Sequence, residues 1–100
     1  MGEHFNKLSP EAAERIAMLM EEAGEVVQIC GKILRHGLNN HHPDNSTPNS
    51  ALLRREITDF LAVAHACRNK EFQGFPGAEE TANAWQKKLK YAHHQGGDNG

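Results

Sequence analysis

The chain has 100 residues, of which 38% are hydrophobic and 24% are charged. These proportions are typical of one globular domain, which we expect at residues 1–95, followed by a disordered tail at 96–100. The net charge of −2 argues against a nucleic-acid binder, because such proteins usually carry an excess of basic residues. No apolar run approaches the roughly 20 residues of a membrane helix, and residues 1–8 lack a signal-peptide core. We therefore expect no membrane association.

The first predicted helix spans residues 10–36. Ser9 is a favourable N-cap residue, and Pro10 suits the first helical position, where its missing N–H costs nothing. Gly37 is a natural stop after a basic last turn. Apolar residues recur at spacings of three and four, which predicts one buried face. These residues are Ile16, Leu19, Met20, Ala23, Val26, Val27, Cys30, Ile33 and Leu34.

Two further helices are predicted after a polar loop at 39–49. The second begins at 47–48 or at residue 50, and its apolar residues are Leu53, Ile57, Phe60, Leu61, Ala64 and Cys67. A connector at 72–77 leads to the third helix, whose apolar residues are Ala78, Ala82, Trp85, Leu89 and Ala92. No segment alternates between apolar and polar residues, so the predicted class is all-α. Both cysteines lie in apolar helical patterns, which is typical of reduced core thiols in a cytoplasmic protein.

Four carboxylates occupy matching positions on the first two helices. Glu22 and Glu25 lie three and six residues after an apolar position of their helix, and Glu56 and Asp59 repeat this spacing on the next. Residues three apart point the same way. If the helices pack as an antiparallel hairpin, both pairs therefore converge on one flank. Oxygen ligands of this kind suit Mg²⁺, with Mn²⁺ as a substitute, and the ion relieves their mutual repulsion.

Other interpretations of these acids are open. Glutamate is a common helix former, so the four carboxylates could form a solvated acidic edge. Apolar residues that flank the same edge would instead leave it half-buried; they are Met18, Ile29, Leu52 and Val63. A di-iron carboxylate bundle normally has Glu-x-x-His on two helices, and neither acidic pair has a histidine in that place.

Basic residues could bind a polyphosphate beside the acids. Lys32 lies two turns beyond Glu25 on roughly the same side, while Lys87 and Lys88 lie at the end of the third helix, where they could equally form its solvated face. The spacing of Trp85 indicates a core or subunit-interface residue, and base stacking is the alternative.

Two acidic segments of the sequence resemble the signature of a known protein family. Glu21-Glu22-Ala23-Gly24-Glu25, followed on the next predicted helix by Glu56-Ile57-Thr58-Asp59, resembles the signature of the MazG-like all-α nucleoside triphosphate pyrophosphohydrolases. The similarity covers residues 8–68, with a weaker echo at 83–91. Arg55 stands where the family often has a glutamate, and the loop between the two halves is long.

This resemblance implies Mg²⁺-dependent cleavage between the α- and β-phosphates of a nucleoside triphosphate, which yields a nucleoside monophosphate and pyrophosphate. It implies that Glu22, Glu25, Glu56 and Asp59 hold the metal and that Glu21 orients the attacking water or acts as its base. Lys32, Lys87 and Lys88 would offset the charge of the phosphates. The base would lie near Trp85 or Phe75, with residues of a second chain contributing.

The predicted helices also bear on assembly. Three helices of this length leave one side of a hairpin poorly covered. We therefore expect a homodimer or homotetramer of four-helix-bundle type, as the resemblance also implies. Two other functions fit the same helices: a non-enzymatic interaction module with a solvated acidic face, and a nucleotide-binding enzyme with a different leaving group.

Overall fold

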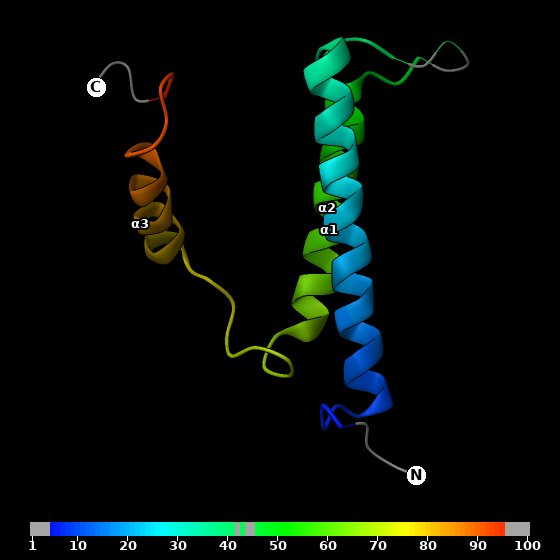
Figure 1. Cartoon of the computed structure of the whole chain (residues 1–100), viewed down its shortest axis with the longest axis vertical. Helices are drawn as coiled ribbons and strands as arrows, with labels where there is room; N and C mark the ends of the chain where they lie inside the picture. The colour runs from blue at the N-terminus through cyan, green and yellow to red at the C-terminus, as the bar shows by residue number, and fades with distance from the viewer. Residues whose placement is uncertain (1–4, 42, 44–45, 96–100) are drawn as a thin grey trace.

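The computed structural model of the chain describes residues 5–41, 43 and 46–95. It contains three helices, α1 (Pro10–His36), α2 (Asn49–Cys67) and α3 (Ala78–Leu89), as Figure 1 shows. The connector between α2 and α3 spans residues 68–77, and an isolated bridge joins Arg68 and Phe72 within it. Because the described residues form no named strand, the predicted all-α class is confirmed for them. The predicted tail at 96–100 lies outside these residues. None of the three helices combines the length and the apolar character that a bilayer-spanning segment requires.

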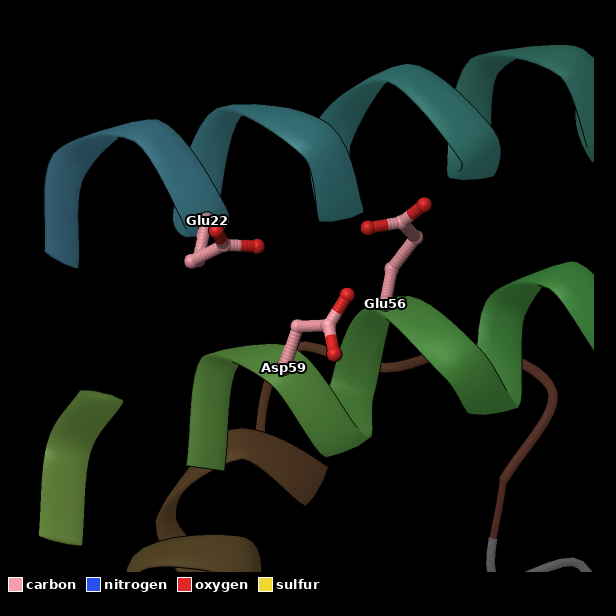
Figure 2. A group of neighbouring side chains, drawn as sticks. All are labelled: Glu22, Glu56 and Asp59. Carbon is pink, nitrogen blue, oxygen red and sulfur yellow. The ribbon is translucent and has the colours of Figure 1, made fainter. Parts of the chain in front are cut away.

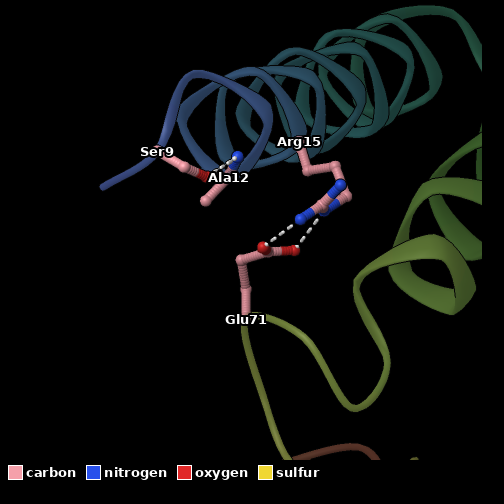
Figure 3. A network of polar contacts seen from close by, with 4 residues as sticks. All are labelled: Ser9, Ala12, Arg15 and Glu71. Atoms are coloured by element: carbon pink, nitrogen blue, oxygen red, sulfur yellow. Dashed lines mark hydrogen bonds and ion pairs between the residues drawn. The ribbon is translucent and has the colours of Figure 1, made fainter. Parts of the chain in front are cut away.

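The ends of α1 are fixed by local chemistry, as the sequence predicted. The hydroxyl of Ser9 accepts a hydrogen bond of 3.1 Å from the backbone N–H of Ala12, which satisfies one free donor of the first turn (Figure 3). At the other end, Gly37 has a φ of 92°, a conformation that glycine adopts without steric cost. Its N–H donates to the carbonyl of Ile33 at 2.7 Å and closes the helix.

α2 runs back along α1, so the two helices form the predicted antiparallel hairpin (Figure 1). Asn49, the first residue of α2, ties this helix to the preceding loop and is only 2% exposed. Its backbone N–H donates to the carbonyl of Asn40 at 2.8 Å, and its side-chain Nδ2 donates to the carbonyl of Gly37 at 3.0 Å. The end of α1 and the start of α2 are therefore joined directly.

The core of the hairpin is small and lies along the α1–α2 seam. Its buried apolar residues are Ile29, Val63, Ala64 and Cys67. At the end of the hairpin away from the loop, Arg15 on α1 binds Glu71 in the connector through two hydrogen bonds of 2.7 and 2.8 Å (Figure 3). This bidentate pair holds the start of the connector against α1.

α3 stands apart from the hairpin and packs against neither α1 nor α2 (Figure 1). The connector that leads to it is anchored to α2 by an aromatic contact. The rings of His65 and Phe75 are stacked with their centroids 4.1 Å apart and their planes 2° from parallel. No residue of α3 is buried, and Trp85 is 50% exposed.

The expectation of a single buried face on α1 needs correction. Met20, Val27 and Leu34 recur every seven residues, yet they are 72%, 71% and 88% exposed, and Cys30 is exposed as well. The buried residue of α1 is instead Ile29, from the flank that the acids occupy. The apolar surface of α1 is wider than one partner helix can cover, and α2 covers the side next to the acids. A heptad stripe of Met20, Val27 and Leu34, called the open stripe below, is left uncovered in the single chain.

Candidate metal centre

Three carboxylates meet in the seam between α1 and α2. Glu22 comes from α1, and Glu56 and Asp59 come from α2, with their side chains pointing toward one another (Figure 2). One carboxylate oxygen from each of these residues lies within 4.8 Å of those of the other two. Glu22 and Glu56 are partly buried, and Asp59 is exposed. The site is therefore open to solvent on one side.

The antiparallel register explains this convergence. The steps of three and four residues that separate Glu22, Glu25 and Ile29 on α1 are matched by equal steps backward along α2, through Asp59, Glu56 and Leu52. Glu22 is thereby placed near Asp59, and Glu25 is placed near Glu56, with which it lines the same cavity. The expectation that both acidic pairs converge on one flank holds for these four residues.

The crowding of negative charge changes the proton affinity of two of these acids. Burial in the seam raises the pKa of Glu22 above its ordinary value, and the nearby carboxylates of Asp59 and Glu25 raise it further. Burial likewise raises the pKa of Glu56, with Glu25 and Asp59 adding to the effect, while Arg55 opposes it. A cation bound among these groups would remove the repulsion and favour their charged forms.

The donor set fits a hard divalent cation. Mg²⁺ prefers oxygen ligands at about 2.0–2.1 Å and usually retains several waters, so three carboxylate oxygens from a half-open seam suit it. Two oxygens on one such ion lie at most about 4.2 Å apart, and the three carboxylate oxygens here lie no more than 4.8 Å from one another. The group contains no histidine or cysteine, which the softer transition metals generally favour.

A cavity continues the seam from the acids toward the loop end of the hairpin. It measures about 350 Å³, and the residues that line it are Glu25, Gln28, Ile29, Lys32, Arg35, Leu52 and Glu56. Lys32, which the sequence marked as a phosphate ligand, therefore shares a cavity with two of the predicted metal ligands. Glu21 is exposed and adjoins Glu22 without joining the triad.

The predicted site residues of α3 lie elsewhere in the single chain. Lys87 and Lys88 line a separate surface cavity on α3 with Glu80, Asn83 and Tyr91. Since α3 contacts neither α1 nor α2, the fold of one chain does not bring Lys87, Lys88 or Trp85 to the acids. Their assignment stays a prediction that requires a second copy of the chain.

Sequence reasoning missed Gln28 and Asn49. Gln28 lines the cavity beside Lys32, and Asn49 lies at the loop end of the same seam. The sequence could have indicated Asn49, because this residue precedes Leu52 and Glu56 by three and seven residues and so lies on the same helical face.

Comparison with family models, with curated proteins and with solved structures gives no match to this chain.

Proposed function

We propose that this chain is a Mg²⁺-dependent nucleoside triphosphate pyrophosphohydrolase of the MazG-like type. The observation that carries the proposal is the meeting of Glu22, Glu56 and Asp59 from two antiparallel helices, with Glu25 close to Glu56. A solvated acidic edge does not require carboxylates from two helices to lie this close. The order of the acidic motifs in the sequence supports the same activity.

The chemistry follows from the charges along the seam. Glu22, Glu25, Glu56 and Asp59 would hold the cation on the flank that the substrate approaches. When bound, Mg²⁺ would polarise the phosphate and lower the pKa of a water molecule. Glu21, exposed next to the triad, would orient the attacking water or accept its proton. Lys32 and Arg35 would bind the phosphates electrostatically, since both line the cavity that adjoins the acids.

Assembly into a homodimer or homotetramer is part of this proposal. The open stripe on α1 presents large apolar residues at a seven-residue spacing, which is the pattern of helices that pack against helices of another hairpin. Pairing two hairpins through this face would make a four-helix bundle. The same pairing would let α3 of one chain cover the partner and bring Lys87 and Lys88 to the phosphates of the substrate.

The test is a panel of canonical and modified nucleoside triphosphates, with pyrophosphate release as the readout. Glu25→Ala should abolish release, whereas Glu14→Gln, a substitution on the same helix but outside the cluster, should leave it intact. Phosphorus NMR of the products separates pyrophosphate release from an enzyme with a different leaving group. If no substrate is cleaved and no divalent cation binds, the proposal fails in favour of an interaction module.

A further inference from the structure

A second cavity lies at the loop end of the hairpin and continues the one beside the acids. It measures about 360 Å³ and is formed by Lys32, Arg35 and His36 from the end of α1, by Asn40, His41 and Pro43 from the loop, and by Asn49 from α2. Lys32 and Arg35 line both cavities. The two cavities are therefore neighbours along one groove, and the side chains of Lys32 and Arg35 lie between them.

Asn49 is the buried member of this lining, and half of its amide is unpaired. Its Nδ2 donates to the carbonyl of Gly37 at 3.0 Å, which fixes the orientation of the side chain. Its Oδ1 is buried and accepts no hydrogen bond from the residues that the structure describes. Since buried acceptors are nearly always paired in folded proteins, this oxygen calls for a donor that the described residues do not provide.

Asn49 lies on the same face of α2 as the acidic residue Glu56. Asn49 and Glu56 are seven residues apart on one face of α2, which corresponds to an axial distance of about 10 Å. This span is comparable with the length of a nucleoside. A phosphate bound by the metal ion beside Glu56 and by Lys32 and Arg35 would therefore place the rest of a nucleotide in the cavity of Asn49. The size of this cavity is within the usual range of about 300–1,000 Å³ for small-molecule sites.

The chemistry of Asn49 Oδ1 determines which part of a nucleotide can bind to it. An amide oxygen only accepts hydrogen bonds, so it does not suit an ionised phosphate, which has no donor. It suits an O–H or N–H group, and the nucleoside part of a nucleotide carries such groups on its sugar and on its base. Lys32 and Arg35 suit the phosphates on the side toward the acids.

We propose that Asn49 is a substrate-positioning residue whose Oδ1 accepts a hydrogen bond from the nucleoside part of a nucleotide, with the phosphates lying over Lys32 and Arg35 toward the acidic cluster. The inference rests on the proposed function for the direction in which the nucleotide lies. It places the nucleoside at the loop end of the hairpin, within one chain, rather than at Trp85 or Phe75.

The first experiment uses the full-length wild-type chain and follows the Asn49 side-chain amide by ¹⁵N–¹H NMR. The two probes, each added with Mg²⁺, are inorganic tripolyphosphate and α,β-methylene nucleoside triphosphates, which resist cleavage at that bond. Both probes should shift backbone signals around Glu25 and Glu56, but only the nucleotides should shift the Asn49 side-chain signal. If nucleotides bind at the acids without moving that signal, this inference is wrong and the proposed function stands. If neither probe binds, both fall.

The second experiment compares dissociation constants. Asn49→Leu should weaken binding of the methylene nucleotide about tenfold or more, since one hydrogen bond to a buried acceptor is lost, and change the tripolyphosphate affinity less than twofold. Asn6→Leu, at an exposed position that lines neither cavity, is the matched control, and the thermal melt of each variant checks its fold. Equal losses for both probes would overturn the inference. A 2′,3′-dideoxy nucleotide separates the two donor sources, because it loses affinity only if the sugar is bound by Asn49.

Discussion

The guanidinium group of Arg15 and the carboxylate of Glu71 are 56 positions apart in the chain and meet through two parallel hydrogen bonds of 2.7 and 2.8 Å (Figure 3). The pair holds the pKa of Glu71 below its ordinary value and raises that of Arg15, because each charge stabilises the other. The carboxylate of Glu71 also lies near the thiol of Cys67, and burial raises the pKa of this thiol. These contacts join the start of α1 to the chain that follows α2, at the end of the hairpin opposite the α1–α2 loop.

This pair makes a pH-dependent contribution to stability. Because the pKa of Glu71 is lower in the folded state than the ordinary value of 4.5, its contribution is present above pH 4.5 and is lost as the pH falls through the folded-state pKa. We expect Glu71→Gln to lower the free energy of unfolding at neutral pH and to match the wild type in acid. Urea unfolding of both proteins across this range checks the prediction. A stability difference that persists at low pH would contradict it.

Metal binding should raise the melting temperature. An ion that binds only the folded chain stabilises it by about 2.7 kcal/mol at 100 times its dissociation constant, which corresponds to roughly 10–20 °C for a domain of this size. We expect this response to Mg²⁺ and Mn²⁺ in differential scanning calorimetry. Asp59→Asn should abolish the response, and Glu14→Gln should retain it. A flat response of the wild type would count against the metal centre.

Without metal, the acidic cluster should destabilise the hairpin. The pKa of Glu56 is raised in the folded state, so the folded chain loses stability as the pH rises from 4.5 through that higher pKa. Glu56→Gln removes the charge with little change in shape, and we expect it to raise the melting temperature by a few degrees at neutral pH in the presence of a chelator. The gain should vanish when the comparison is made in saturating Mg²⁺. A metal-free variant that melts below the wild type would refute this.

Lys32 should act on the substrate rather than on the fold. It is exposed and lines both cavities of the groove. We expect Lys32→Gln to lower kcat/KM for pyrophosphate release by about tenfold, in line with the loss of one charge-assisted hydrogen bond to phosphate, while the melting temperature stays the same. Lys70→Gln, at the other end of the hairpin, is the matched control. An equal loss in both variants would indicate a general charge effect.

The open stripe should determine the oligomeric state. Val27→Lys places a charge in the middle of the stripe, and we expect it to convert the assembly to monomers in sedimentation and light-scattering measurements. Gln28→Lys adds the same charge one position away, on the cavity side, and should leave the assembly intact. A wild type that is already monomeric at micromolar concentration would exclude the four-helix bundle.

Local features made the helices predictable. Ser9, Pro10 and Gly37 set the ends of α1 through backbone hydrogen bonding and allowed dihedral angles, which depend on neighbouring residues only. The convergence of the four carboxylates was predictable for a similar reason, because a spacing of three residues and an antiparallel turn fix which edges of two helices meet. The ends of α1 and the meeting of the acids were therefore predicted correctly, whereas the buried face of α1 was not.

Surface coverage was less predictable. Met20, Val27 and Leu34 have the apolar character of core residues, but whether such residues are buried depends on what packs over them, and α2 packs over Ile29 instead. The same limit applies to Trp85, whose spacing gives α3 an apolar face without saying what covers it.

The amino-acid sequence alone determined the three helices and the all-α class, because helix ends and helical spacing are consequences of local chemistry. Given an antiparallel hairpin, it also determined that Glu22, Glu56 and Asp59 meet on one flank. Only the tertiary structure decided that Arg15 meets Glu71, that Asn49 is buried with an unpaired oxygen, and that the heptad stripe of α1 lies open. Contacts between distant segments depend on the rotation and register of whole helices, which many small packing terms set together and no short motif encodes.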